Sequence, residues 1–254
     1  MHYLFAKERP DYSDLASGRV FYSIPGHPAF PIRLADEILQ RCLARRQANH
    51  MTGPCVLYDP CCGAAYHLSV LARLHWHSFH QIIGSDIEQK AVNVAQKNLG
   101  LLSVEGLDKR ISEISEMFRL YGKESHKEAL DSARRLRDRI GTLTGEHHLK
   151  TRVFQASALN GEELRANLKG VAVDIVFADV PYGLHSHWQN PDSNPDSGNS
   201  LWRMLDALLG VLAPTSVVAI ASNKRQKAFH EGYQRIDEFQ VGKRRVVLLK
   251  PSSG

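Results

Sequence analysis

The chain has 254 residues, of which 43% are hydrophobic and 23% charged, a composition typical of globular proteins. It has no run of about 18 apolar residues that would form a transmembrane helix, and its N-terminus lacks the basic and apolar regions of a signal peptide, so we expect a cytoplasmic protein with no membrane partner. The formal net charge of +5 favours an anionic partner such as nucleic acid about as much as it favours no partner.

The N-terminal part gives few periodic signals before residue 31. The stretch "SIPGHPAFP" (23–31) is rich in proline, which fixes the backbone and removes a donor, so it predicts a loop. Apolar residues at helical spacing, such as Leu34 and Ile38, predict a helix at about 31–47. We therefore treat residues 1–50 as an N-terminal loop and helix extension of a single domain that spans residues 1–254.

Strands and helices alternate from residue 55 onward. We expect strands at 55–59, 81–86, 152–157, 173–180 and 216–222, and helices at 64–77, 88–102, 160–168 and 201–212. The C-terminal stretch predicts two further strands joined around Val241–Gly242. This pattern predicts an α/β fold with a seven-stranded, mostly parallel sheet that is covered on both faces and has one antiparallel edge strand.

Residues 103–149 interrupt the alternation with a charged segment that predicts a helical insertion. Its apolar positions indicate two amphipathic helices: Ile111, Ile114, Phe118, Leu130, Leu136 and Ile140. A packed cap and a substrate-binding appendage explain this insertion equally well.

The cysteines do not form a metal-binding or disulfide pattern. Cys61 and Cys62 are adjacent, and Cys42 and Cys55 lie at unrelated spacings. Free cysteine packs well as a small apolar residue, so we expect buried thiols and no metal site.

Acidic residues end the first two predicted strands, where open α/β sheets bind their ligands. Asp59 ends the first strand, and Gly63 permits a close backbone approach in the turn that follows. Asp86 ends the second strand, where a carboxylate can accept both hydroxyls of a ribose. Together they suggest an adenosine-containing ligand, although Asp86 also suits the N-cap of the next helix.

The fourth strand ends in "DVPYG" (179–183), the most informative segment of the chain. Asp179 and neighbouring backbone carbonyls can face the N–H groups of a flat nitrogen heterocycle, and Tyr182 can stack on its face. The alternative is a strand-terminal turn with Tyr182 packed on the sheet.

These segments resemble known enzymes. "YDPCCGAAY", "GSDIEQKAVNVAQKNL" and "DIVFADVPYG" are similar to class I S-adenosylmethionine-dependent methyltransferases, and the last resembles the (D/N/S)-P-P-Y signature of enzymes that methylate nitrogens of bases or of glutamine. "PGHPAFPIRLADEI", "LYDPCCG" and "DVPYG…HW" resemble, through most of the chain, the AviRa-type avilamycin-resistance 23S rRNA methyltransferases. A nicotinamide-dependent oxidoreductase is disfavoured because the turn lacks G-x-G-x-x-G.

The resemblance implies a Rossmann-like fold, S-adenosylmethionine as cofactor, and methyl transfer to N1 of a guanine in 23S rRNA, with resistance to orthosomycin antibiotics. The partner would be 23S rRNA or a precursor of the large ribosomal subunit, and we expect a monomer. Two alternatives stay open: a methyltransferase that acts on DNA or on protein glutamine, and a non-catalytic RNA-binding relative whose cofactor loop is weakened.

Site residues follow from the resemblance position by position. Asp59, Pro60 and Gly63 match the cofactor turn, Asp86 the ribose-binding acid, and Ser157 a position at which many relatives carry an acid that contacts the adenine amine. The full cofactor-binding set is Asp59, Pro60, Cys61, Gly63, Ala65, Asp86, Ile87, Ser157 and Asp179. Asp179, Pro181 and Tyr182 match the catalytic loop, with Val180 where the signature has its first proline.

Ala65 departs from the family pattern, which has glycine there. If residue 65 needs a positive φ, alanine costs about 1 kcal/mol; if the glycine serves close approach of the cofactor, one methyl group pushes the ligand away. Either effect weakens binding about tenfold, so we expect a retained site.

The chemistry expected at this site is alignment of a base nitrogen with an electrophilic methyl group. Asp179 and the Val180 carbonyl would orient the guanine edge, Tyr182 would stack on it, and Asp179 would take the N1 proton. His185 and His187 are competing bases that rank below Asp179. Trp188 would stack on a neighbouring base or, as an equally good alternative, pack as an apolar side chain under the loop.

Basic residues follow the fifth strand and the last hairpin turn, where they would contact phosphates without reading sequence. A solvated charged face is an equally good interpretation. The residues of the two clusters are Lys224, Arg225 and Lys227, and Lys243, Arg244 and Arg245. The predicted substrate-binding set is Tyr182, Gly183, His185, Trp188, Lys224, Arg225 and Arg244.

Overall fold

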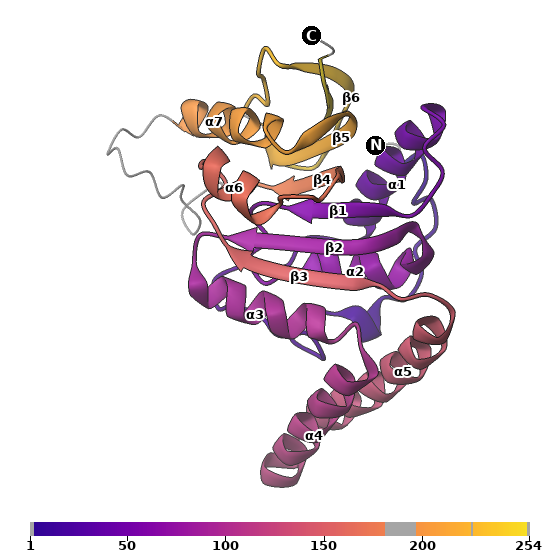
Figure 1. The fold of residues 1–254 in the computed structure, drawn as a ribbon. Helices are drawn as coiled ribbons and strands as arrows, with labels where there is room; N and C mark the ends of the chain where they lie inside the picture. Colours follow the sequence, from indigo (N-terminus) through magenta and orange to yellow (C-terminus); the bar gives the residue numbers. More distant parts are fainter. Residues whose placement is uncertain (1–2, 181–196, 225, 253–254) are drawn as a thin grey trace.

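The computed structural model describes residues 3–180, 197–224 and 226–252, and its core is a single seven-stranded sheet (Figure 1). The strands are β1 Cys55–Asp59, β2 Phe79–Asp86, β3 Lys150–Gln155, β4 Val173–Asp179, β5 Leu212–Asn223, β6 Tyr233–Val241 and β7 Arg244–Pro251. They lie in the order β3-β2-β1-β4-β5-β7-β6. The strand order reverses between β1 and β4, and ligands of open α/β sheets bind beyond the carboxyl ends of the strands at such a point.

The predicted fold class is confirmed. β1 pairs in parallel with β2 and β4, and β4 with β5. β7 is antiparallel to both of its neighbours, so the closing hairpin inserts β7 between β5 and the outermost strand, β6. The antiparallel strand therefore lies one place inside the edge, because the two-residue connection at Gly242 places β6 beside β7 rather than beside β5.

Helices cover both faces of the sheet because side chains alternate along each strand. Leu57, Ile175 and Phe177 face the core that is shared with α1 Ile32–Ala48, α2 Tyr66–Leu74 and α3 Gln89–Gly100. Tyr58 and Val176 face the opposite core, which includes α6 Gly161–Asn167 and α7 Ser197–Leu209. Short 3-10 helices occupy Ser13–Leu15 and Trp76–Ser78.

Several predicted boundaries move by a few residues. The strand predicted at 152–157 is Lys150–Gln155, the helix predicted at 201–212 is Ser197–Leu209, and the strand predicted at 216–222 already begins at Leu212. The last shift has a clear cause: Leu212 pairs with Val173 before a register irregularity, so pairing with β4 extends β5 across Pro214.

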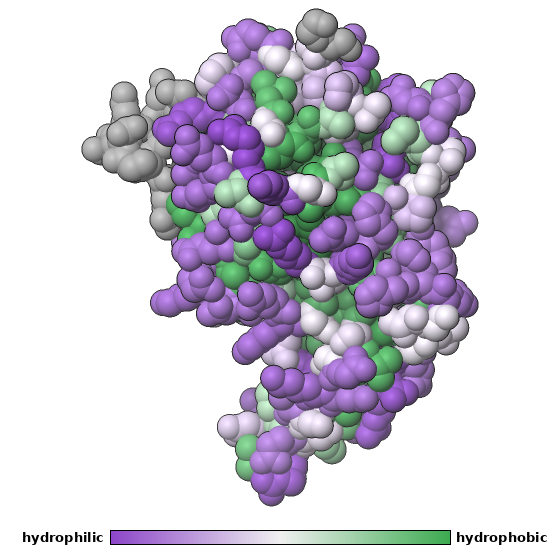
Figure 2. Space-filling model, viewed as in Figure 1, coloured by the Kyte–Doolittle hydropathy of each residue, from purple (hydrophilic) through white to green (hydrophobic). Residues whose placement is uncertain are grey.

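The predicted insertion forms two helices, α4 Val104–Tyr121 and α5 Glu124–Glu146, which project from the sheet as a hairpin (Figure 1). Ser103 caps α4 through the amide of Gly106, and Gly122 ends it at φ +59°. Residues 104–146 contain nine basic and nine acidic side chains, and the hairpin surface in Figure 2 is mostly hydrophilic. The charge balance gives no excess of basic side chains for phosphate, and the choice between a packed cap and a substrate-binding appendage stays a prediction.

The N-terminal segment is fixed to distant parts of the chain. Asp14 pairs with Arg135 of α5 at 2.6 Å. The buried carboxylate of Glu37 accepts the backbone amides of Leu4, Phe5 and Ala6 at 2.8–2.9 Å and pairs with Arg41 at 2.7 Å.

Among the described residues, none of the helices combines the length and the apolar character that a membrane span requires.

Candidate active site

The side chain of Asp86 holds the turn that follows β1. Asp86, at the end of β2, accepts the amide of Gly63 through Oδ2 at 2.9 Å and the amide of Glu88 through Oδ1 at 3.0 Å. Burial raises the pKa of Asp86, although the two amides oppose the shift. The N-cap of α3 is Glu88, so Asp86 is not the helix cap. Each of its oxygens keeps a lone pair for a further donor such as a hydroxyl.

The turn itself has left-handed backbone at two positions. Gly63 has φ +51°, and Ala65 has φ +51° and ψ 29°. Ala65 is held there because its amide donates to the Cys62 carbonyl at 2.7 Å and its carbonyl accepts the Ser69 hydroxyl at 2.8 Å. Its side chain is 0% exposed and belongs to the core. Of the two expected costs of alanine, the backbone strain is present, whereas the methyl group does not face the open side of the turn.

A pair of carboxylates, Asp59 and Asp179, lies at the switch point. Asp59 is fully buried; its Oδ1 accepts the Cys61 amide at 2.8 Å, and its Oδ2 lies 3.0 Å from Nε2 of His67. Asp179 ends the adjacent strand β4, and its Oδ1 is buried with no hydrogen-bond partner among the described residues. Burial raises the pKa of Asp179 to about 6, and nearby Arg244 and His67 oppose this while Asp59 adds to it. A carboxyl group with such a pKa is suited to accept a proton near neutral pH.

Cys61 lies among these acids but is not a nucleophile. Burial, and then the charges of Asp59, Asp86 and Asp179, raise the pKa of its thiol well above the ordinary value, so the thiol stays protonated. All four cysteines are free, and only Cys61 is partly exposed. Within residues 3–180, 197–224 and 226–252, no group of three His, Cys, Asp or Glu side chains could hold a metal ion.

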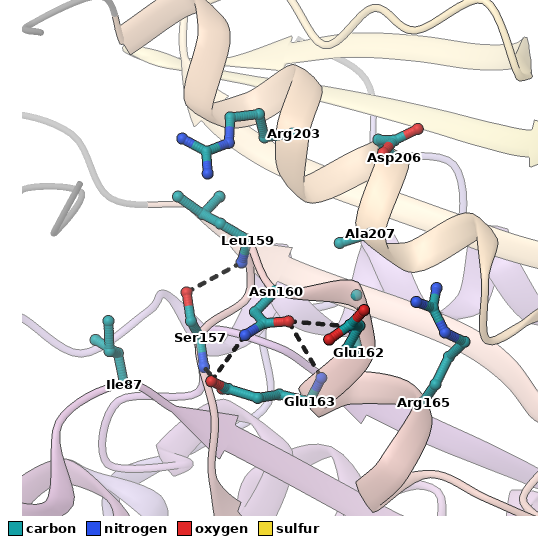
Figure 3. A pocket seen from close by; sticks show the side chains of 11 residues that line it. Ile87, Ser157, Leu159, Asn160, Glu162, Glu163, Arg165, Arg203, Asp206 and Ala207 are labelled. Atoms are coloured by element: carbon teal, nitrogen blue, oxygen red, sulfur yellow. Dashed lines mark hydrogen bonds between the residues drawn. The ribbon is translucent and has the colours of Figure 1, made fainter. Parts of the chain in front are cut away.

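An open cleft of about 750 Å³ lies beyond Asp86, and Ile87 and Ser157 line it (Figure 3). The Ser157 amide donates to Glu163 at 2.9 Å, and the Asn160 side chain donates to the same carboxylate at 2.9 Å. Glu163 therefore supplies, next to Ser157, a carboxylate that the sequence analysis missed. Its sequence signal is an Asn160-x-x-Glu163 helix cap, which indicates only local structure.

The basic residues separate into two groups. Lys224, Lys227 and Lys243 are exposed, and the backbones of Lys224 and Lys243 are joined by a hydrogen bond of 3.2 Å at the carboxyl edge of the sheet. Arg245 instead pairs with Glu238 at 2.7 Å. Arg244 is half-buried with its guanidinium 5.1 Å above the Phe30 ring, a position that does not match the expected outward contact with phosphate.

The remaining predicted site residues lie outside the described residues: Pro181, Tyr182, Gly183, His185, His187, Trp188 and Arg225. Of the predicted cofactor set, the structure brings Asp59, Cys61, Gly63, Asp86 and Asp179 to one edge of the sheet. Ile87 and Ser157 line the adjoining cleft.

Comparison with known proteins identifies a family that this chain matches. The model of the family described as rRNA methyltransferase AviRa matches residues 1–244. A curated protein of Streptomyces viridochromogenes, named 23S rRNA (guanine(2535)-N(1))-methyltransferase, is 40% identical over 249 residues, which cover 98% of this chain and 95% of that protein.

Solved structures agree with this match. The rRNA methyltransferase aviRa of Streptomyces viridochromogenes superimposes with a TM-score of 0.85 at 38% identity, covering 98% of this chain and 96% of that one. TrmN of Thermus thermophilus superimposes with a TM-score of 0.51 at 15% identity, covering 89% of this chain and 50% of the other, a likeness of fold alone.

Proposed function

The chain belongs to the AviRa family of rRNA methyltransferases, and from this premise we propose that it methylates N1 of a guanine in 23S rRNA with S-adenosylmethionine as the methyl donor. The observation that carries the proposal is the 40% identity, over 98% of the chain, to a 23S rRNA guanine-N1 methyltransferase. The carboxyl edge of the sheet supports it with the residues that this chemistry needs.

The cofactor fits the turn after β1. A side chain added at Gly63 would meet no atom within 4 Å, so the glycine leaves open space that a ligand can fill against the backbone. The carboxylate of Asp86 borders this space and would accept ribose hydroxyls, and the cleft between Ile87 and Ser157 would take the adenine. When bound, S-adenosylmethionine supplies a methyl group on a sulfonium sulfur, whose carbon–sulfur bond breaks as the nitrogen–carbon bond forms.

Asp179 is the residue that we assign to the base. Its buried Oδ1 lacks a hydrogen-bond partner among the described residues, a costly state that an N–H donor from a substrate would relieve. An N1–H of guanine is such a donor, and transfer of its proton to Asp179 leaves the electron pair on N1 for the new bond. With a pKa raised to about 6 by burial, the carboxylate remains ionised at neutral pH and still binds a proton better than an exposed aspartate.

The exposed lysines beside this edge suit RNA phosphates. Lys224 and Lys243 lie on neighbouring backbones at the carboxyl ends of β5 and of the β6–β7 turn, the side of the sheet on which Asp179 ends β4. Phosphate contacts there would position the RNA, whereas base contacts select the nucleotide.

Mapping the methylated nucleotide tests the proposal. We expect purified protein to transfer labelled methyl groups to 23S rRNA, and nucleoside mass spectrometry to identify 1-methylguanosine. Bare rRNA and large-subunit precursors serve as separate substrates, with DNA and a glutamine peptide as the competing ones. Asp179→Asn should lower transfer by about 10²–10⁴ while still binding S-adenosylhomocysteine. Label in DNA or peptide only, or undiminished transfer by Asp179→Asn, would contradict this assignment.

Resistance to orthosomycins is the biological consequence that we infer from family membership. Expression in a sensitive bacterium should raise the minimal inhibitory concentration of avilamycin, and Asp179→Asn should not. An equal effect of both forms would separate resistance from methylation.

A further inference from the structure

We propose that His67 and Arg244 are positioning residues that set the charge of Asp179, His67 through Asp59 and Arg244 directly. The inference rests on the proposed role of Asp179 and extends it to two side chains that come from opposite ends of the chain. Neither residue is part of the cofactor turn.

Strand register places Asp59, Asp179 and Arg244 on one face of the sheet. Asp179 pairs with Ala221, which pairs with Val246, and paired residues share a face. Arg244 lies two residues before Val246, so it shares that face as well. Asp59 is two residues beyond Leu57 on the neighbouring strand β1 and faces the same core.

Two aromatic rings fix the cationic side chains there. The His67 ring packs against Phe177 at a centroid distance of 5.0 Å and against Phe30 at 5.8 Å. Phe177 is two residues before Asp179 on β4, and Phe30 carries the Arg244 guanidinium on its face, 5.1 Å from the centroid. Phe30 therefore lies between the histidine and the arginine and sets the position of both.

The arrangement brings two carboxylates, a histidine and an arginine together; Asp59 and His67 are buried, and Asp179 and Arg244 are half-buried. Like charges on Asp59 and Asp179 oppose each other's ionisation, and a cation beside either one relieves this. Nε2 of His67 lies 3.0 Å from Oδ2 of Asp59, where a protonated ring would offset the Asp59 charge and let Asp179 carry the second negative charge. Among the described residues, the titratable or charged groups that act on Asp179 are Asp59 from β1, Cys61 from the turn, His67 from α2 and Arg244 from β7.

This arrangement has a function in the proposed reaction. A base must be ionised when the substrate arrives and must hold the proton that it takes. Burial alone would favour the neutral acid. His67 and Arg244 counteract burial.

The direct test is the titration of Asp179 in the protein without ligand, followed by NMR of ¹³C-labelled aspartate carboxyl groups and assigned with Asp179→Asn. His67→Gln and Arg244→Gln should each raise the midpoint by about half a pH unit or more, because Arg244 and a protonated His67 favour the ionised carboxylate. Asp59→Asn should lower the midpoint, because it removes a negative one. The opposite signs separate a charge effect from loosened packing, which would not reverse with the charge removed.

Matched controls use the same substitutions away from the cluster. His77 pairs with Glu146 at 3.3 Å on the surface, and Arg245 pairs with Glu238 beside Arg244 on the opposite face of β7. His77→Gln and Arg245→Gln should leave the Asp179 midpoint unchanged. If His67→Gln does not fold, Arg244→Gln and Asp59→Asn still test the two opposite shifts of the Asp179 midpoint.

The acid limb of the pH profile for kcat/KM in methyl transfer should move in the same directions. Midpoints of His67→Gln and Arg244→Gln that move no more than those of the controls would overturn the inference. Absence of methyl transfer by the wild-type protein would instead refute the proposed function, because the titration does not depend on activity.

Discussion

Replacement of Ala65 by glycine is the change for which the structure makes the sharpest statement. Ala65 occupies the left-handed region, and its methyl group is fully buried in the core. Release of the strain stabilises the folded protein by about 1–2 kcal/mol. Loss of a buried methyl group costs about 0.8 kcal/mol, and the greater freedom of glycine in the unfolded chain costs about 0.5–1 kcal/mol. These contributions nearly cancel, so Tm should change by no more than about 4 °C.

Cofactor affinity should change even less. The turn is held in the same backbone conformation by Cys62 and Ser69 before any ligand arrives, so the strain is common to the free and bound protein. We expect Ala65→Gly to bind S-adenosylhomocysteine within about threefold of the wild-type affinity, a difference below about 0.7 kcal/mol.

Gly63→Ala is the matched variant, because Gly63 has the same φ of +51° but opens onto free space. The added methyl group should cost about 1–2 kcal/mol of stability and should also weaken ligand binding by about tenfold. Isothermal titration calorimetry and thermal unfolding measure both quantities. A tenfold gain in affinity for Ala65→Gly would refute the reasoning, because it would mean that the buried methyl group obstructs the ligand.

Three further changes test other parts of the structure. Glu37→Ala leaves three backbone amides and Nε of buried Arg41 without their acceptor, although Arg41 keeps its bond to Asp237; this should cost about 3–5 kcal/mol and lower Tm by about 10 °C. Burial opposes ionisation of Glu37, but the backbone amides and Arg41 outweigh burial and lower the pKa of this carboxyl group. The Glu37 carboxylate therefore stabilises the folded protein above the pKa that Glu37 has in the unfolded chain, and this stabilisation is lost as pH falls through its pKa in the folded protein. Lys243→Gln should reduce the slope of log binding constant for RNA against log salt by about 0.7–0.9. Arg73→Met should raise Tm by a few degrees, because two guanidinium nitrogens of Arg73 are buried without a hydrogen-bond partner in the part of the chain that the structure describes, and burial lowers its pKa to about 9.

Each of these changes has a control or an opposing outcome. Glu116 pairs with Arg119 at 2.7 Å on the surface, and Glu116→Ala should leave Tm almost unchanged. Lys127→Gln in the charge-balanced hairpin should leave the salt dependence of RNA binding unchanged. A decrease in slope equal to that of Lys243→Gln would show that α5 also contacts RNA. A lower Tm for Arg73→Met would indicate that a buried water or ion satisfies the guanidinium.

Local patterns predict much of this fold. The strand at 55–59 and the two-residue turn at Gly242 agree with the sequence because a continuous apolar run and a glycine at positive φ specify them locally. β3 is harder to predict, since it is an edge strand with mostly half-buried and exposed residues and lacks a clear alternation. Pairing with β4 lengthens β5, which a proline at position 214 argues against when the chain is considered alone.

In the site, too, local sequence predicts some residues, whereas others are recognised only from long-range contacts. Asp59, Gly63 and Asp86 follow from strand ends and turn chemistry, and the structure joins Gly63 to Asp86 directly. His67 carries no signal of its own, because its neighbours Phe30 and Phe177 are far apart in sequence. Arg244 appears in the sequence as one of three consecutive basic residues, and only strand alternation separates it from Arg245.

The pairing of α1 with the last hairpin also orders events during synthesis. Arg41 pairs with Asp237, which lies 196 residues later in the chain, and Asp14 pairs with Arg135, which lies 121 residues later. Since translation releases the N-terminus first, these early segments leave the ribosome long before their partners exist. α1 packs against α2, which follows it closely in the chain, but its contacts with β5 and its ion pair with Asp237 form only after the last strands are made. Contacts of such long range slow folding, so the part of α1 that they cover stays exposed on the nascent chain until those strands emerge.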